Sequence, residues 1–276
     1  MPERRASGVE RRASGDTDGA LPAAGGSSLD ARRSTLDALY VVQLGRRPYA
    51  EVLELQRAVA RARIAGDVPE DVLLLVEHPP VVTLGRSSKT AHLVASAELL
   101  AARGVELFEV ERGGDVTFHG PGQLVGYPVV DLKRHKQDLH WYLRQVEEAL
   151  IRALARHGVA GWRSAGYTGV WVGDEPDVVG GTRKIASIGV HARDWVTWHG
   201  FALNVATELA YFDLIVPCGI QGVTMTSLAR ELGPGAPSLD VVAADAAAEF
   251  GALFGLAVAE LPVERLTELL GAAAPR

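Results

Sequence analysis

The one cysteine of this 276-residue chain, Cys218, lies between a proline and a glycine in the sequence Ile-Val-Pro-Cys-Gly-Ile. A single thiol can form neither an intramolecular disulfide nor a zinc site built on paired thiolates. Two roles are left for it: a small apolar side chain of the core, or a nucleophile. The local sequence alone favours the inert role, because free cysteine is among the residues most often buried.

A lysine stands at the start of an apolar run. Lys184 begins "KIASIGVHA", whose small and β-branched residues predict a strand. In a strand, Lys184 would point to the same side as Ala186, Ile188 and Val190. A lysine on an apolar face is costly unless its charge has a partner. The alternative is a lysine at the strand edge with its amine in water.

The third candidate is the glycine-rich segment 111–132, "ERGGDVTFHGPGQLVGYPVVDL". Glycines allow backbone N–H groups to approach a ligand closely, and here they surround Thr117, Phe118 and His119. Arg112 and His119 bracket this stretch and a simple turn needs neither, although an ordinary glycine-rich hairpin stays an alternative. Further on, "WHGFALNV" (198–205) places a glycine before an apolar strand that could form the floor of a pocket.

The motifs of several familiar chemistries are missing from the sequence. It contains no Gly-Lys dipeptide and therefore no phosphate loop, no Gly-x-Ser-x-Gly elbow and no His-Glu-x-x-His helix. The stretch "GPGQLVG" misses the spacing of the dinucleotide fingerprint by one residue. We therefore expect neither a cofactor nor a metal ion.

Four segments, "RGGDVTFHGPGQ", "RKIASIGVH", "HGFALN" and "PCGI" followed by "VTMTSL", occur in an order that resembles the octanoyltransferase family of lipoic acid synthesis. The resemblance covers roughly residues 37–260. It implies a fold related to the biotin and lipoate protein ligases. It also implies an enzyme that moves an octanoyl group from acyl carrier protein to a lysine amine. The acceptors would be lipoyl domains of 2-oxoacid dehydrogenase complexes or the H protein of glycine cleavage.

The resemblance also assigns residues to roles. Cys218 would carry the acyl group as a thioester, and Lys184 would assist it. Substrate contacts would come from three stretches of the chain: Arg112, Gly113, Gly114, Asp115, Val116, Thr117, Phe118 and His119; Ser187, Ile188 and Gly189; and Gly200, Phe201 and Ala202.

Acid–base chemistry is compatible with these roles. Exchange between two thioesters is close to isoenergetic, so the first half of the reaction needs mainly a thiolate. A free thiol has a pKa of about 8.5, and a neighbouring ammonium favours its ionised form. Pro217 and Gly219 would hold the sulfur on a stiff turn, with backbone N–H groups free for the oxyanion. In the second half, we hypothesise that Lys184 no longer faces a thiolate and takes the proton of the attacking amine.

The rest of the chain has to position these groups. We expect residues 37–276 to form one catalytic α/β domain, a mixed central sheet flanked by helices, because strands and helices mix without strict βαβ order. Helices are predicted over 48–66, opened by Pro48, and over 138–158, with Asp138 as N-cap and Gly158 as stop signal, and a final amphipathic one over 238–255. The apolar stripe of the second is Leu139, Leu143, Val146, Leu150 and Leu154. Residues 71–86 are predicted to form a buried strand bent at two prolines.

The composition indicates which partners and which cellular compartment to expect. The chain is 47 % hydrophobic with a formal net charge of −6, which argues against nucleic acid as the main partner. It has no run of about 18 apolar residues, so we expect no membrane span, and its single cysteine suits a reducing compartment, the cytoplasm. Residues 1–36, with the near-repeat "RRASGVERRASG", are predicted to be a disordered tail.

Docking of the donor raises one difficulty, because acyl carrier proteins are acidic and so is this chain. A local basic patch would resolve it, and the stretch 131–137 offers Lys133, Arg134 and Lys136. These residues could equally be a solvated charge run before a helix.

Two other functions stay open. One is an ATP-dependent lipoate or biotin ligase of similar fold, which ATP dependence would reveal. The other is a catalytically inactive module that binds acyl carrier protein and would tolerate Cys218→Ser.

Overall fold

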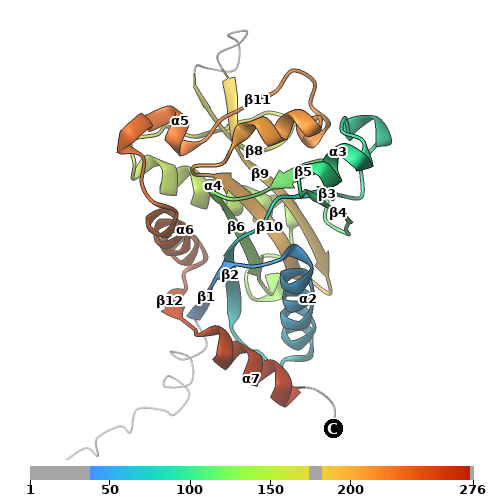
Figure 1. Cartoon of the computed structure of the whole chain (residues 1–276). Coiled ribbons are helices and arrows are strands. Elements are labelled where there is room, and N and C mark those ends of the chain that lie inside the picture. The colour runs from blue at the N-terminus through green and yellow to red at the C-terminus, as the bar shows by residue number, and fades with distance from the viewer. Residues whose placement is uncertain (1–37, 174–181, 274–276) are drawn as a thin grey trace, which may run out of the picture. The chain divides into compact units, whose positions relative to one another are not determined.

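The predicted strands belong mainly to one large mixed sheet. The structure, a computed structural model, describes residues 38–173 and 182–273, and the tail predicted for residues 1–36 lies outside them. Within these stretches the main sheet runs in the order β12 (Ala257–Glu260), β1 (Ala38–Arg46), β2 (Asp71–Glu77), β6 (Gln123–Val129), β10 (Val196–Asn204), β9 (Thr182–Arg193), β8 (Tyr167–Gly173) and β7 (Trp162–Ser164), with β11 (Thr224–Met225) also paired to β9. β1 is parallel to both its neighbours and the other adjacent pairs of the row are antiparallel, so the sheet is mixed, as predicted (Figure 1).

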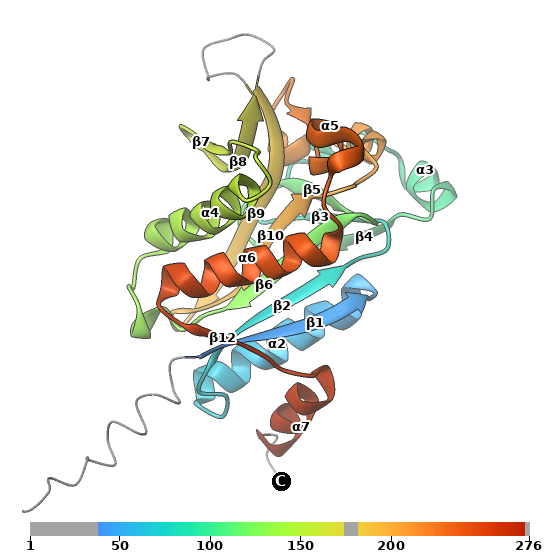
Figure 2. The ribbon, with the colours of Figure 1, turned by 90° about the vertical axis from the view of Figure 1, so that its left-hand side faces the viewer.

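Helices cover both faces of this sheet. α4 (Leu139–Ala155) and α6 (Leu239–Phe254) pack on one face, and α2 (Tyr49–Ala65) packs on the other together with α7 (Val263–Ala273) (Figure 2). The flanking helices are as expected. No helix in the described stretches is long and apolar enough to cross a membrane.

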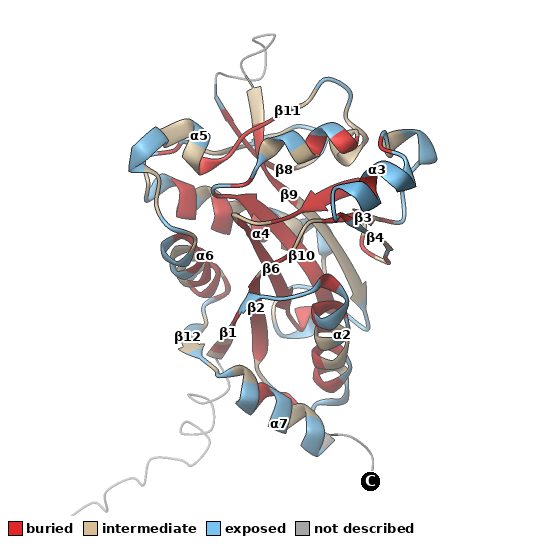
Figure 3. Ribbon diagram, viewed as in Figure 1, coloured by how far each residue is buried: buried red, intermediate tan, exposed pale blue. Residues whose placement is uncertain are grey.

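Strand β2 shows how the two faces are filled. Leu73 and Leu75 belong to the core beneath α4 and α6, whereas Val72 and Leu74 belong to the core beneath α2. Successive side chains of a strand point to opposite faces, so an unbroken apolar run buries both. The central strands are accordingly buried along most of their length (Figure 3).

The long helices begin and end close to the predicted residues. The Asp138 side chain accepts a hydrogen bond from the backbone N–H of Trp141 at the start of α4, and Gly66 and Gly255 close α2 and α6 in the left-handed conformation. The stripe predicted for α4 is partly wrong, because Leu139 is 38 % exposed. The buried positions of α4 are instead Tyr142, Val146, Glu147, Ala149, Leu150, Ala153 and Leu154.

The helix over 238–255 is not the final one. β12 and α7 follow it, and β12 adds a strand to the edge of the main sheet beside β1. α7 carries Val263, Leu266 and Leu270 at spacings of three and four, and they pack on the core beneath α2. Its sequence therefore holds the apolar stripe of a helix, which the prediction missed.

The prediction of one bent strand over residues 71–86 is wrong. β2 ends before Pro79 and Pro80, and the chain then enters a second sheet in the order β4 (Glu106–Glu109), β3 (Val81–Leu84) and β5 (Val116–His119). Proline has no N–H to donate to a neighbouring strand, so β2 cannot continue in the main sheet past Pro79 and Pro80. The glycine-rich segment 111–132 therefore spans both sheets, with β5 in the second sheet and β6 in the main one.

Short helices and turns complete the described stretches. They are α3 (Ala97–Ala102), α5 (Leu228–Leu232) and the 3₁₀ turns η1 (Thr90–His92), η2 (Leu132–Arg134), η3 (Leu209–Leu214), η4 (Pro217–Gly219) and η5 (Gly233–Gly235).

Candidate active site

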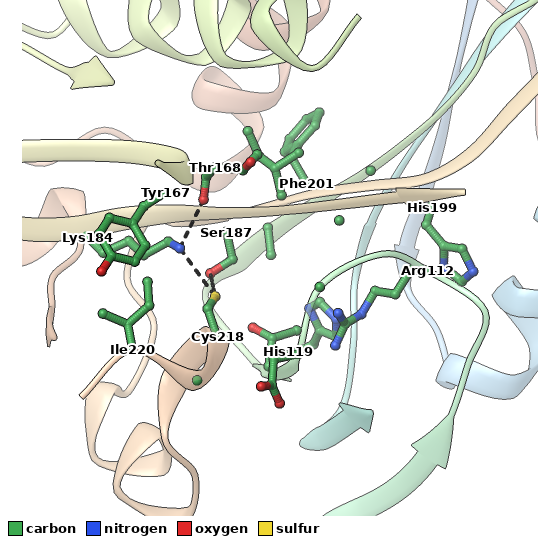
Figure 4. A pocket seen from close by; sticks show the side chains of 18 of the residues that line it. Arg112, His119, Tyr167, Thr168, Lys184, Ser187, His199, Phe201, Cys218 and Ile220 are labelled. Carbon is green, nitrogen blue, oxygen red and sulfur yellow. Dashed lines mark hydrogen bonds between the residues drawn. The ribbon is translucent and has the colours of Figure 1, made fainter. Parts of the chain in front are cut away.

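Cys218 and Lys184, 34 positions apart in the chain, lie in contact. Lys184 Nζ is 3.2 Å from Cys218 Sγ (Figure 4). Lys184 is 1 % exposed, so its amine is not in bulk water at a strand edge. The same Nζ donates to the Thr168 carbonyl oxygen at 3.1 Å and lies 5.1 Å from the ring centroid of Trp171. A sulfur, a carbonyl and an aromatic ring thus offset the cost of burying this amine.

A β-bulge directs Lys184 toward the sulfur. The pairing of β9 with β8 shifts register between Ala186 and Lys184, which leaves Ile185 without an opposite residue. A bulge breaks the regular alternation of a strand. Ser187, three positions after Lys184, therefore also faces Cys218, with its Oγ 3.7 Å from Sγ. The prediction that Lys184 and Ala186 share a side is wrong, because Ala186 lies in the core beneath α4 while Lys184 lines the pocket.

The thiol sits on a strained turn. Cys218 has φ 55° and ψ 19°, in the left-handed region that residues other than glycine rarely adopt. Strain of this kind is common at functional residues. The neighbouring N–H groups are occupied, because Gly219 N donates to the Val216 carbonyl at 2.9 Å and Ile220 N donates to the Pro217 carbonyl at 3.1 Å. Contrary to expectation, these two donors are not free for an oxyanion.

Main-chain bonds anchor the cysteine loop on both sides. β11 pairs in parallel with β9, with Met225 opposite Lys184, and Thr226 N donates to the Lys184 carbonyl at 2.9 Å. Before the cysteine, Val216 N donates to the His92 carbonyl at 2.8 Å. One of the two anchors is therefore the backbone of the lysine itself.

The glycine-rich segment reaches the pocket through alternate residues. Thr117 and His119 line the pocket, whereas Val116 and Phe118 are buried in the hydrophobic cluster of the smaller sheet. The period of two along β5 explains this difference. The side chains of Val116 and Phe118, expected to contact substrate, therefore fill the core instead.

Arg112 and Gly113 fix the position of this segment. Arg112 is 7 % exposed, and its guanidinium donates to the Thr83 carbonyl at 2.7 Å and to the Gly113 carbonyl at 3.1 Å. Burial lowers the pKa of Arg112 from its ordinary value. Gly113 does not line the pocket, but its N–H donates to the Val190 carbonyl of β9 at 2.8 Å. These bonds hold the glycine-rich segment against the strand that carries Lys184.

The pocket has a volume of about 280 Å³. The residues expected there that line it are Arg112, Gly114, Asp115, Thr117, His119, Lys184, Ser187, Ile188, Gly189, Gly200, Phe201, Ala202 and Cys218. Its size is near the lower end for small-molecule sites, which is consistent with a medium-length acyl chain. Across the described part of the chain, no three His, Cys, Asp or Glu side chains gather in a way that could hold a metal ion.

Eight further residues line the pocket without having been predicted: Tyr49, Tyr127, Gly166, Tyr167, Thr168, His199, Gly219 and Ile220. Tyr127 and His199 stand within the segments 111–132 and 198–205 noted above, whereas Tyr49 comes from α2 and stands in no such segment. Tyr127 Oη is hydrogen-bonded to His78 Nε2 at 2.9 Å, and the ring of Tyr49 stacks on that of His119. Burial lowers the pKa of His78 to about 4 and that of His119 to about 3, so both are neutral at pH 7.

The basic run 133–136 lies far from the sulfur. Asp131, directly before it, is bridged to Val196 at the tip of the β9–β10 hairpin, beside Arg193. Arg193 is six residues along β9 from Ser187, whose Oγ lies 3.7 Å from the sulfur, or about 20 Å at the rise of a strand. Lys133 and Lys136 also have acidic neighbours, Asp131 at 3.7 Å and Asp138 at 3.0 Å. This setting favours a solvated charge run over a docking patch.

Comparison with known proteins identifies close relatives of the chain. It is 50 % identical over 244 residues to an octanoyltransferase of Acidobacterium capsulatum, which covers 84 % of this chain and 97 % of the relative. It is 51 % identical over 207 residues to an octanoyltransferase of Rubrobacter xylanophilus, which covers 74 % of this chain and 88 % of that one.

Two solved structures described as lipoate protein ligases share the fold. A bi-partite lipoate protein ligase from Thermoplasma acidophilum superposes with a TM-score of 0.66 at 17 % identity, over 85 % of this chain and 91 % of that one. A lipoate-protein ligase A bound with ATP superposes with a TM-score of 0.62 at 18 % identity, over 85 % and 93 %. Residues 48–251 match the family model of the lipoyl protein ligase A/B catalytic domain. The chain belongs to this family and, within it, to the octanoyltransferases.

Proposed function

We propose that the octanoyl group passes through a thioester on Cys218, from acyl carrier protein to the lysine amine of a lipoyl domain, in the cytoplasm. The observation that supports this most directly is the 3.2 Å contact between Lys184 Nζ and Cys218 Sγ in a pocket. The single cysteine of the chain also suits a reducing compartment.

In the first half of the reaction, the Lys184 ammonium stabilises the Cys218 thiolate. The sulfur attacks the carbonyl carbon of the donor thioester, and a new carbon–sulfur bond forms as the bond to the carrier's sulfur breaks. Lys184 gives its proton to the departing thiolate. The products are the free carrier thiol, the acylated cysteine and a neutral lysine.

In the second half, the neutral amine of the acceptor lysine attacks the Cys218 thioester. The carbon–nitrogen bond of an amide forms, the bond to Cys218 Sγ breaks, and Lys184 takes the proton released by the acceptor nitrogen. This restores the thiolate and ammonium pair with which the cycle began. One lysine beside one cysteine therefore supplies a proton carrier for both halves without ATP.

Intact-protein mass after incubation with octanoyl-acyl carrier protein tests the proposal. We expect a gain of one octanoyl group in the wild type, none in Cys218→Ala, and release of the group on adding a lipoyl domain. The same assay in the absence of ATP separates a transferase from a ligase. Transfer to the lipoyl domain by Cys218→Ala would refute the thioester route.

A further inference from the structure

Glu147 is a buried carboxylate on α4 that the proposed chemistry does not use. Its side chain is 0 % exposed, although a carboxylate is seldom buried completely. Arg144 and Arg163 pair with it at 2.5 and 3.2 Å, but their own side chains are 47 % and 35 % exposed. Because these two arginines are themselves partly exposed, they could pair equally well with a carboxylate at the surface. The ion pairs therefore do not explain why Glu147 is buried.

Another partner of Glu147 is a backbone amide of β8. Gly169 N donates to Glu147 Oε1 at 3.0 Å. The residue pairs of β8 with β9 run from Gly173 to Val170, so the carboxylate serves as acceptor just where this pairing ends. A buried N–H without a partner costs about 1 to 3 kcal/mol, and a charged acceptor makes the stronger bond.

The backbone held in this way packs directly on Lys184. The Thr168 carbonyl accepts from Lys184 Nζ at 3.1 Å, and a β-carbon on Gly169 would lie 2.8 Å from Lys184 Cε. Gly169 has φ +134°, a conformation that glycine adopts far more readily than other residues. Any shift of this backbone would therefore move the amine relative to the Cys218 sulfur.

We infer that Glu147 is a positioning residue for the reaction. Through Gly169 N it fixes the Thr168 carbonyl, and that carbonyl holds the Lys184 amine against Cys218. The inference rests on the roles proposed above for Lys184 and Cys218.

The pH dependence of Cys218 alkylation by iodoacetamide tests this in the full-length chain. Alkylation reports the thiolate without any acyl donor, and Cys218 is the only thiol. In Glu147→Ala we expect the midpoint of the pH–rate profile to rise by about one unit and the rate at pH 7 to fall about tenfold. Glu147→Gln keeps an acceptor oxygen for Gly169 N and should keep the wild-type pH–rate profile. We expect this even though loss of the ion pairs with Arg144 and Arg163 lowers the thermal unfolding midpoint of the variant. Glu147→Met, which fills a similar volume without an acceptor, replaces the alanine variant if that variant does not fold.

Two control variants separate positioning from stability. Arg163→Gln weakens the ion pair but leaves the bond to Gly169, and Glu148→Ala removes the adjacent carboxylate, which binds Arg152 and Arg163. Both should leave the pH profile unchanged. A wild-type profile in Glu147→Ala, or the same shift in Arg163→Gln, would overturn the inference while leaving the thioester route intact. Transfer by Cys218→Ala would instead overturn the proposed function.

Discussion

Gly219 lies so close to Asp115 that a β-carbon on the glycine would be 2.5 Å from Asp115 Oδ2. The same β-carbon would lie 2.9 Å from the ring of His92, which is hydrogen-bonded to Asp115 at 2.6 Å. The residue after Cys218 is thus packed against a hydrogen-bonded pair from two other segments of the chain. A side chain at position 219 would therefore have to displace either this pair or the turn that carries Cys218.

The first prediction concerns Gly219. In Gly219→Ala we expect the rate of Cys218 acylation to fall about 100-fold, because a displacement of the sulfur by about 1 Å is enough for a loss of that size. Gly222→Ala is the matched control: Gly222 also has positive φ, but its β-carbon would meet nothing within 4 Å. It should cost about 1 kcal/mol of stability and little activity. Equal acylation rates in the two variants would contradict the role given to the contact.

The second prediction separates activity from stability at Lys184. Lys184→Met should lower octanoyl transfer by about 10² to 10⁴, the usual contribution of a group that carries protons. The free energy of unfolding should change by no more than about 1 kcal/mol, because the lost bond to Thr168 is offset by the burial cost of the amine. Arg183→Met, one residue earlier in an ion pair with Glu231, serves as control for activity. Transfer by Lys184→Met at more than a tenth of the wild-type rate would be inconsistent with the mechanism.

The third prediction is a loss of stability in mild acid. The pKa of His78 is lowered to about 4 and that of His119 to about 3 in the folded protein, against about 6.5 in the unfolded chain. The unfolded chain therefore binds protons first, so the stability is complete above pH 6.5 and falls as the pH drops toward 4. Each histidine contributes a slope of about 1.4 kcal/mol per pH unit in this window.

Denaturant titrations between pH 6 and 4.5 check this slope. His78→Gln should reduce it by about 1.4 kcal/mol per unit, whatever its effect on stability at pH 7. His140→Gln, at an exposed position of α4, should leave it unchanged. An unaltered slope in His78→Gln would show that this histidine is protonated in the folded state.

The fourth prediction concerns the basic run. Reversing Lys133, Arg134 and Lys136 to Glu should change the KM for octanoyl-acyl carrier protein by no more than about twofold in low salt. A separation of about 20 Å along β9 is about two screening lengths at 0.1 M salt. A strong rise in KM would restore the docking patch that the charge pattern first predicted.

Features with a local cause could be predicted from the sequence. The ends of α2, α4 and α6 follow from capping residues and glycines, and the mixed sheet follows from the irregular order of elements. The two sheets could not be separated, because an apolar run through Pro79 and Pro80 looks the same whether or not the ladder continues. α7 was missed although its sequence carries an apolar stripe, Val263, Leu266 and Leu270.

Some residues of the site could also be predicted, because they stand in local motifs of the sequence. Family motifs predicted Cys218 and Lys184 as site residues. A motif does not show which way a side chain points, and Val116 and Phe118 face the core. The bulge at Ile185 and the bond from Gly169 to Glu147 depend on segments far apart in the chain. Such long-range relationships leave no local signature.

The pairing of β11 with the backbone of Lys184 has a consequence for how the enzyme can open. β11, which follows Cys218, is hydrogen-bonded to the main chain of Lys184. The Cys218 thiol and the Lys184 amine are therefore held by one shared support, the paired backbone of β9 and β11. Any motion that widens the pocket has to come from parts that lie outside this support. Motion during turnover should therefore be greatest away from the reacting atoms, and the thiol and amine should travel together rather than separate.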